Sequence, residues 1–382
     1  MSAICNHRDC TGCGLCVASC PKKCISMEPD NRFGHLFPKV NQSACIDCGL
    51  CQKNCPVLHP VEQIDPLTVY AAWSKDEDDY KSSTSGGAAS VLSRHVLSKG
   101  GVVYGCAMLP DIDVRHIRID NVNDLSKLKG SKYVQSTVTD IYPQLRNDVC
   151  EGRLTLFIGT PCQVGAVKNM FKPQPENLIL VDLICHGVPS LHMLKQHVKR
   201  VANYPHYDKV IFREGNGIYV IIVVVDGKEV YRRYYNKLHF KDFYINSFFE
   251  GYIFRDSCYK CSYAYAKRIS DITIGDFWKL GKRISADYIP EHPYGCSLVL
   301  PSTKKGKQLI EEISVKMNLY ERTVEEAVEG NDQLRHATMF DRRKKLFRLL
   351  YPYLGSYAYK LAIMDRYMKY NIKRVIRKVV KK

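Results

Sequence analysis

From residue 68 onward, short apolar runs of strand length alternate with stretches in which apolar residues recur every three or four positions. These runs and their turn signals predict strands at residues 68–73, 102–108, 154–158, 178–184, 209–213, 218–225, 228–235 and 295–301. The helical pattern predicts helices that end at Lys99, Phe171 and Val201, and others at residues 137–149, 240–251 and 302–317. Asp226-Gly227 is the turn signal of a hairpin. This order of elements predicts a mixed α/β domain.

Two successive strand–loop–helix units each carry a cysteine just beyond the end of the strand. The first strand ends in the sequence GTPC at residues 159–162, and the second is followed by Cys185. The carboxyl ends of parallel strands lie side by side, and ligands bind there in α/β proteins. Pro161 suits the first position of a helix, so Cys162 should lie at a helix N-terminus, where the dipole favours a thiolate.

The first sixty residues follow a different pattern, in which one cysteine-containing sequence occurs twice. Each copy reads C-x-x-C-x-x-C-x-x-x-C-P, first at residues 10–21 and again at residues 45–56. This is the bacterial ferredoxin run for two [4Fe–4S] clusters, in which three cysteines bind one cluster and the fourth binds the other. The spacing assigns one cluster to Cys10, Cys13, Cys16 and Cys55, and the other to Cys45, Cys48, Cys51 and Cys20.

A zinc site and a disulfide framework are the alternatives for this region. Zinc sites use two CxxC pairs and need neither the third cysteine nor the proline. A disulfide framework is typical of short secreted chains, whereas this chain has 382 residues and shows no apolar signal-peptide core in residues 1–20. Oxygen-sensitive cluster motifs beside many cysteines are consistent with a reducing cytoplasm.

Four further cysteines form a second candidate metal site: Cys162, Cys185, Cys258 and Cys261. A lone CxxC fits a redox dithiol, half a zinc site or half an Fe–S site. The two strand-end cysteines supply the other pair, and the neighbouring ferredoxin run favours a third [4Fe–4S] cluster over zinc. A catalytic Cys162 and buried structural cysteines are the alternatives. The remaining cysteines lack ligand spacing and are expected to be small core residues: Cys5, Cys24, Cys106, Cys150 and Cys296.

Two polar loops are candidate phosphate-binding segments. The first reads SSTSGG at residues 82–87 and precedes a helix, whose N-terminus offers free N–H groups to a phosphate, although an ordinary helix cap is the alternative. The second reads GSKY at residues 130–133 and is a candidate for holding a ribityl chain or a phosphate. His186 is either structural or a contact of a flavin or substrate. Arg213 and Asp276 are further candidate contacts.

Positive charge is concentrated at the C-terminus. The formal net charge is +17, and residues 335–382 contribute +13 of it through fifteen Lys or Arg and two Asp. The body of the chain therefore does not resemble a nucleic-acid-binding protein. An apolar stripe in this tail predicts a basic amphipathic helix: Leu361, Met364, Met368, Ile372, Val375 and Val379. Such a helix packs on the body, lies on an anionic membrane surface, or binds an acidic partner or a nucleic acid.

Several sequence motifs together resemble those of the coenzyme F-420 hydrogenase/dehydrogenase beta-subunit family. They are SxSGG at 83–87, GSKY at 130–133, GTPCQ at 159–163, DLICHGVPS at 182–190, FRE at 212–214, and SCYKCSY with DITIGDFW within 257–278. The resemblance implies FAD beside a [4Fe–4S] cluster bound by Cys162, Cys185, Cys258 and Cys261. It also implies a set of FAD contacts: Ser85, Gly86, Gly87, Gly130, Ser131, Lys132 and Tyr133.

The expected architecture has three parts: an α+β ferredoxin-like domain at 1–60, a mixed α/β flavin-binding domain at 61–334 and a basic helical tail at 335–382. The resemblance implies an oxidoreductase that passes electrons between ferredoxin or another redox protein and a two-electron small-molecule substrate or hydride carrier. It does not single out deazaflavin, because related chains also occur as stand-alone reductases and near bacterial surface-polysaccharide genes. The alternative is an electron-transfer subunit that relays to a partner enzyme. The expected location is the cytoplasm, or the inner face of the membrane through the tail.

Overall fold

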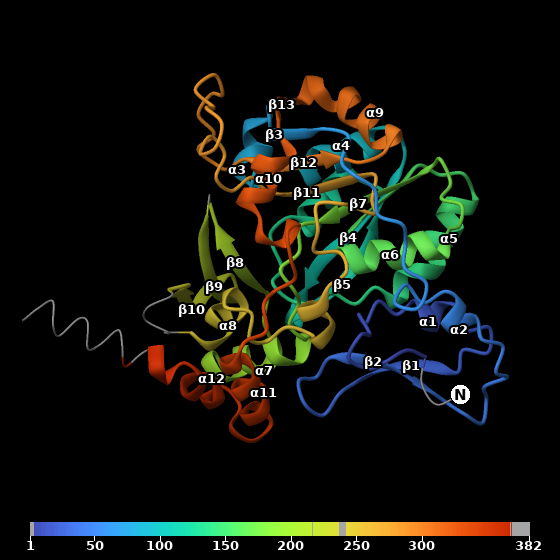
Figure 1. Ribbon diagram of the computed structural model, residues 1–382, viewed down its shortest axis with the longest axis vertical. Coiled ribbons are helices and arrows are strands. Elements are labelled where there is room, and N and C mark those ends of the chain that lie inside the picture. The colour runs from blue at the N-terminus through green and yellow to red at the C-terminus, as the bar shows by residue number, and fades with distance from the viewer. Residues whose placement is uncertain (1–3, 216, 237–241, 367, 369–382) are drawn as a thin grey trace, which may run out of the picture.

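The computed structural model describes residues 4–215, 217–236, 242–366 and 368. It is a mixed α/β protein, as predicted, with a small N-terminal region, an eight-stranded mixed sheet and a three-stranded sheet (Figure 1). No helix in these ranges is long and apolar enough to cross a membrane. Most of the apolar stripe predicted for the tail lies outside the described residues, and only its first three members fall within them.

The N-terminal region contains one antiparallel hairpin and two one-turn helices. Its strands are β1 (Ile25–Pro29) and β2 (Leu36–Val40), and its helices are α1 (Leu15–Ala18) and α2 (Leu50–Lys53). Gly14 and Gly49 precede the two helices with φ values of 70° and 72°, a conformation that costs other residues about 1–2 kcal/mol. The two copies of the cysteine sequence therefore begin a helix at the same point.

The large sheet has the strand order β13-β3-β12-β11-β7-β6-β4-β5. Its strands are β3 (Val69–Ser74), β4 (Val102–Leu109), β5 (Asp113–Ile119), β6 (Thr155–Gly159), β7 (Leu178–Leu183), β11 (Ile272–Asp276), β12 (Ser297–Pro301) and β13 (Met317–Arg322). The four central strands, β11, β7, β6 and β4, run parallel, and the outer strands pair antiparallel. Since β6 and β7 are parallel neighbours, the segments that follow these strands and carry Cys162 and Cys185 lie side by side, as predicted.

Helices cover both faces of this sheet because alternate strand residues point in opposite directions. One face carries α5 (Tyr142–Cys150) and α6 (Pro161–Met170), and the other carries α4 (Ala88–Ser98) and α9 (Lys304–Ile313). Tyr104 and Phe157 pack with α5 and α6, whereas Val103 and Leu156 pack with α4 and α9. The N-terminal region lies against the α5 and α6 side (Figure 1), where the Tyr142 hydroxyl donates to Cys13 O at 2.7 Å.

The second sheet consists of β8 (Lys209–Glu214), β9 (Ile218–Val225) and β10 (Lys228–Tyr234). It shares one hydrophobic cluster with α7 (Leu191–Val201), α8 (Phe243–Phe249), α11 (Arg342–Leu354) and α12 (Tyr357–Ala362). Asp226 and Gly227 both have positive φ between β9 and β10, which confirms the predicted hairpin. Two short helices, α3 (Glu77–Lys81) and α10 (Val324–Gly330), complete the main elements.

The predicted helix at residues 302–317 is wrong at its C-terminal end. The helix α9 stops at Ile313, and β13 begins at Met317 and pairs along β3. The pattern misled because Ile313 and Met317 are four residues apart and both are buried, although they belong to different elements. The hairpin β1–β2 and strand β5 were not predicted, since their alternation of polar and apolar residues is short and charged.

Gly86 allows the 82–87 loop to rest directly on the large sheet. A Cβ atom at this position would lie 2.0 Å from Ala72 O and 2.6 Å from the Ser297 nitrogen. We expect Gly86→Ala to lower the free energy of unfolding by about 3 kcal/mol, because backbone atoms on two strands must move apart. Gly130→Ala is the matched control: it has open space and bears only the strain of a φ of 83°, about 1–2 kcal/mol. Anaerobic thermal unfolding measures both, and equal losses would contradict the close-packing explanation.

Candidate functional site

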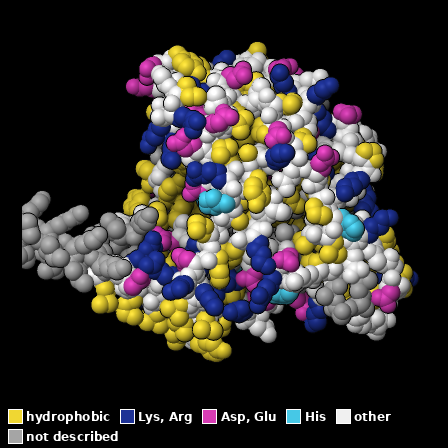
Figure 2. Space-filling view, viewed as in Figure 1, with side chains coloured by type: hydrophobic (Ala, Val, Ile, Leu, Met, Phe, Trp, Pro, Cys, Tyr) yellow, Lys and Arg dark blue, Asp and Glu magenta, His cyan; other side chains and the backbone are white. Residues whose placement is uncertain are grey.

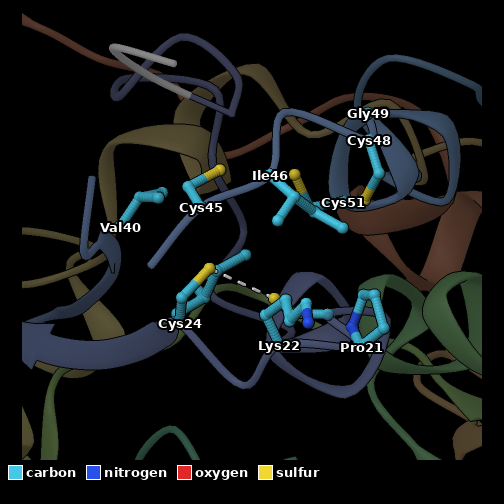
Figure 3. Close-up of a pocket in the computed structure, with 11 residues that line it drawn as sticks. Pro21, Lys22, Cys24, Val40, Cys45, Ile46, Cys48, Gly49 and Cys51 are labelled. Atoms are coloured by element: carbon cyan, nitrogen blue, oxygen red, sulfur yellow. Dashed lines mark hydrogen bonds between the residues drawn. The ribbon is translucent and has the colours of Figure 1, made fainter. Parts of the chain in front are cut away.

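Four cysteines of the N-terminal region, which we call the outer set, surround one small cavity: Cys20, Cys45, Cys48 and Cys51. Figure 3 shows the side chains of Cys45, Cys48 and Cys51 turned toward the same space. Cys24 also lines this cavity, and its Sγ lies 3.4 Å from Cys20 Sγ. The expectation that Cys24 serves only as a core residue is therefore incomplete, because it contacts a candidate ligand.

The other four cysteines of the repeat form the middle set: Cys10, Cys13, Cys16 and Cys55. Burial is the main cause that raises the pKa of Cys13, to about 12, and the nearby thiols of Cys10 and Cys55 add to it. The same causes raise the pKa of Cys16. Cys5, expected to be a core residue, is half-buried, and the Cys10 thiol is the main cause of its raised pKa. The pairing of Cys55 with the first cysteine sequence agrees with the ferredoxin spacing.

The inner set brings together cysteines from three elements. Cys162 lies in the first turn of α6, Cys185 follows β7, and Cys258 and Cys261 lie in and just after the short helix Asp256–Lys260. Burial, and then the thiols of the other three, raise the pKa of Cys185. The four side chains that the sequence pattern grouped are therefore neighbours.

We predicted that the helix N-terminus favours the thiolate form of Cys162. For the free thiol this prediction is wrong, because its pKa is raised. Burial raises the pKa of Cys162, although the Thr160 hydroxyl lies 3.3 Å from its Sγ and opposes the shift. Pro161 does occupy the first position of α6, and Thr160 and Gln163 form a capping box. Desolvation therefore outweighs the helix N-terminus at this position.

The three sets follow one another in space. Cys162 of the inner set contributes to the raised pKa of Cys13 in the middle set, after burial and Cys10. Cys13, Cys162 and Cys261 also pack in one hydrophobic cluster. The middle and outer sets are joined by the two cysteine sequences themselves, since Cys20 and Cys55 each belong to the set formed by the other copy.

Arg255 lies between the middle and inner sets and is only 1% exposed. Its Nε donates to Cys10 O at 2.6 Å, and its Nη2 donates to Leu36 O at 2.8 Å and lies 3.7 Å from Cys10 Sγ. Gly12 makes room for it, because a Cβ there would lie 2.7 Å from Nη1. No carboxylate in the described ranges forms an ion pair with Arg255. Its positive charge instead opposes the rise that burial causes in the pKa of Cys162 and Cys258.

The donor chemistry of the three sets fits iron–sulfur clusters, because each set offers the four thiols that one [4Fe–4S] cluster needs. In the part of the chain that the structure describes, no group of three or more His, Cys, Asp or Glu side chains is placed to hold a metal ion. A cubane holds its thiolates farther apart than a single zinc ion does, because its iron and sulfide core lies between them.

A cavity of about 450 Å³ adjoins the inner set at the carboxyl ends of β6, β7 and β11. This volume lies in the range of cofactor and substrate sites. Cys185 belongs to its wall, as do both candidate phosphate loops and the three candidate contacts His186, Arg213 and Asp276. The position at the ends of parallel strands is the one predicted from the sequence.

Six of the seven candidate FAD contacts line this cavity: Ser85, Gly87, Gly130, Ser131, Lys132 and Tyr133. Gly86 does not, because it faces β3 and β12. The Ser131 hydroxyl lies 3.2 Å from Thr84 Oγ1 and joins the two loops. The Lys132 ammonium donates to three carbonyl oxygens, of Cys106, Leu128 and Lys129, at 2.8–3.0 Å. Lys132 therefore fixes the shape of its loop, with all three of its donors used.

An ion pair between a buried arginine and a half-buried aspartate forms another wall of the cavity. Arg213 Nη1 and Nη2 each donate to one carboxylate oxygen of Asp276 at 2.8 Å. The guanidinium lies over the rings of Tyr219 and Trp278, at 5.5 and 5.7 Å from their centroids. Arg213 Nε is buried without a hydrogen-bond partner among the described residues. An unpaired buried donor is costly, so this cavity wall fits a ligand that carries an acceptor.

Sequence reasoning missed His116, which lines the cavity from β5. Its Nε2 lies 2.9 Å from Ile158 O and its Nδ1 lies 3.0 Å from Ser136 Oγ. Burial lowers the pKa of His116 to about 4, so the ring is neutral at pH 7. A single histidine in an unpredicted strand gives no sequence signal. Arg255 was also missed, although its place three residues before Cys258 was a usable hint.

Comparison with known proteins gives two family matches. Residues 152–327 match the C-terminal part of the family described as "Coenzyme F420 hydrogenase/dehydrogenase, beta subunit", and residues 9–58 match "4Fe-4S dicluster domain". No curated protein matches the chain. Among solved structures, a chain of the F420-reducing [NiFe] hydrogenase complex from Methanosarcina barkeri, solved as a xenon derivative, is similar at 18% identity. The match covers 72% of this chain and 91% of that chain, with a TM-score of 0.48.

The two family matches confirm the resemblance drawn from the sequence motifs. Residues 152–327 span GTPCQ, CHGVPS and the CxxC of the inner set, and residues 9–58 span both copies of the ferredoxin sequence. The chain is therefore an iron–sulfur electron-transfer protein related to the beta subunit of coenzyme F420 hydrogenase/dehydrogenase, with an N-terminal 4Fe-4S dicluster domain.

Proposed function

We propose that the chain is an iron–sulfur flavoprotein oxidoreductase, with [4Fe–4S] clusters at the outer, middle and inner sets and FAD in the large cavity. The observation that carries the proposal is the order of these sites in space: outer, middle, inner, then a cavity that shares Cys185 with the inner set. FAD, when bound, accepts electrons singly and passes them on in pairs, as a one-electron chain needs for reducing an organic bond.

The outer set is the proposed entry point for electrons. Cys48 is exposed, and the neighbouring Ile46 is 56% exposed. An apolar side chain beside an accessible ligand suits a transient contact with ferredoxin or another redox protein. The middle and inner sets are more deeply covered, so electrons entering at the surface reach the outer set first.

The polar loops around the cavity are the proposed phosphate and ribityl contacts. The 82–87 loop precedes α4, whose N-terminal N–H groups favour an anion. Lys129 ties this loop in place, since its Nζ forms an ion pair with Asp79 Oδ1 and donates to Ser82 Oγ, each at 2.6 Å. Tyr133, stacked on Phe248 with centroids 4.5 Å apart, offers an apolar wall for a ring. The residues present therefore fit a dinucleotide with an aromatic head.

A charge reversal between the two loops tests flavin binding. We expect Ser131→Glu to lose most of the bound flavin, because its carboxylate would stand where phosphate is proposed and would repel it. Ser131→Gln is the matched control, as it has the same size and no charge. Flavin released from anaerobically purified protein is the measurement, with iron content as the check on folding. Equal loss in both variants would mean that size alone excludes the cofactor and would contradict a phosphate at this position.

His186, Arg213 and Asp276 are the proposed substrate-side contacts. His186 is exposed and lines the cavity, while Arg213 and Asp276 present a fixed pair of opposite charges. These groups orient a polar substrate or a hydride carrier, and Arg213 Nε is free to donate to it.

A relay protein without its own substrate is the second candidate. It is favoured by the description of the matching family, which names a beta subunit of a hydrogenase or dehydrogenase. Incubation of the fully reduced, isolated chain with soluble two-electron acceptors separates the two candidates. Oxidation of the chain by such an acceptor supports the oxidoreductase, whereas oxidation only in the presence of a partner enzyme supports the relay.

A further inference from the structure

The outward side of α11 and α12 carries an unusually apolar surface, which we call the terminal face. Its exposed apolar side chains include Leu349 at 61%, Tyr353 at 83% and Tyr357 at 67% of their full exposure. The complete apolar set within the described residues is Leu346, Leu349, Tyr353, Leu354, Tyr357, Leu361, Met364 and Met368. Figure 2 shows hydrophobic side chains gathered at the lower left of the molecule, over these two helices.

This exposure does not arise from a poorly packed pair of helices. The inward sides of α11 and α12 are fully covered: Phe347 and Ala358 are 0% exposed and Tyr359 is 2% exposed. They belong to the same hydrophobic cluster as the three-stranded sheet. The folded body therefore already has its core, and the outward apolar side chains add a second face that folding does not use. A contiguous exposed apolar face of this kind marks an interaction site.

The charges on the terminal face are positive. Arg342, Lys345 and Lys360 are exposed along the same helices. Of the two acidic residues in this part of the chain, Asp365 is paired with Arg343, and Asp341 caps α11 by accepting from the Lys344 N–H. After Met368 the sequence adds seven Lys or Arg and no Asp or Glu. Apolar and basic side chains thus occur together on this face, and the basic side chains outnumber the acidic ones.

We infer that the terminal face binds the surface of an anionic phospholipid bilayer. Leucine and methionine side chains enter the boundary between headgroups and acyl chains, while the lysines and arginines stay at the phosphate level. Tyr353 and Tyr357 suit that boundary, since each has an apolar ring and a polar hydroxyl. The helices lie on the membrane in this arrangement and do not span it.

Other occupants fit these side chains less well. A nucleic acid would use the basic groups but would leave the leucines and methionines unpaired with any apolar surface. A second copy of the chain would bring two positive faces together, which costs free energy. An anionic bilayer offers both negative charge and an apolar interior to the same two helices. This inference is independent of the redox chemistry proposed above.

Flotation of the whole protein with lipid vesicles tests the inference. We expect binding to vesicles of phosphatidylcholine containing phosphatidylglycerol, weak binding to phosphatidylcholine alone, and release by high salt. The double variant Leu349→Glu/Tyr353→Glu should lower the bound fraction about tenfold or more. It replaces two apolar side chains that enter the bilayer with carboxylates that the anionic headgroups repel. Val315→Glu is the matched control: Val315 is 72% exposed and lies between α9 and β13, far from α11 and α12 (Figure 1). Iron content and the visible spectrum verify that each variant is folded.

Two outcomes would overturn the inference. If the double variant binds anionic vesicles as well as the unmodified chain does, the basic tail acts without the terminal face. If no vesicle binding occurs and the chain is a dimer that the double variant dissociates, the face is an interface between two copies.

Discussion

Cys162→Ala should leave flavin bound but stop its reduction by electrons that enter at the outer set. Cys162 packs with Cys13 of the middle set in one hydrophobic cluster, and its thiol contributes to the raised pKa of Cys13. The variant should lose one cluster, or about four of about twelve irons per chain. The flavin loops stand on other elements and do not involve Cys162, so flavin content should be retained.

The measurement is stopped-flow absorbance after mixing the oxidised variant with reduced ferredoxin. We expect the absorbance of the clusters in the N-terminal region to fall as fast as it does in the unmodified chain. The absorbance of the flavin should change no faster than it does when reduced ferredoxin is left out. Cys150→Ala is the matched control, because Cys150 is exposed and lies outside all three sets. The prediction that Cys150 is a core residue is therefore wrong. Normal flavin reduction in Cys162→Ala would remove the inner set from the electron path.

Arg255→Met should lower the reduction potential of the middle and inner clusters by an amount on the order of 100 mV. A reduced cluster carries one more negative charge, so loss of a neighbouring positive charge destabilises the reduced state. The magnitude follows from one charge at about 6 Å in a medium with an effective dielectric constant of about 20. Arg255 is suited to this role because it is buried, lies 3.7 Å from Cys10 Sγ and forms no ion pair with a carboxylate in the described ranges.

Anaerobic redox titration followed by electron paramagnetic resonance measures this effect cluster by cluster. Arg255→Lys keeps the charge but loses the donated hydrogen bonds to Cys10 O and Leu36 O. Arg255→Lys should therefore keep the reduction potentials close to those of the unmodified chain, even if the N-terminal region is bound less firmly to the rest of the protein. The outer cluster is the internal control, because no contact joins Arg255 to Cys20, Cys45, Cys48 or Cys51 in the described structure. If the reduction potentials are unchanged in Arg255→Met and the clusters are intact, Arg255 has only a structural role.

Much of the fold could be read from the sequence, because its central strands are apolar runs with clear turn signals. The strands before Cys162 and Cys185 were predicted, and their parallel pairing followed from the helices between them. The edge strands β5 and β13 could not be predicted in this way. Their register depends on pairing with β4 and β3, which are distant in sequence or separated by irregular turns, and edge strands with polar faces carry a weak periodic signal.

The candidate site was predictable where chemistry dictates spacing. The eight N-terminal cysteines recur at the fixed intervals of a ferredoxin run, so the outer and middle sets were visible without a structure. The inner set was grouped instead from two cysteines at strand ends and one CxxC pair. Arg255 and His116 belong to no sequence motif, and only the folded structure shows their contacts. Arg255 fills the space left by Gly12, and His116 hydrogen-bonds to Ile158 O. The role of Gly86 was also hidden, because a glycine in a polar loop looks the same whether it admits a ligand or a neighbouring strand.

Iron and flavin content of anaerobically purified protein, with its visible spectrum, tests the central claim most directly. The proposed arrangement predicts about twelve irons and about one FAD per chain. About eight irons and no flavin would contradict it, because the inner set would then have no cluster and the cavity beside Cys185 would serve another ligand.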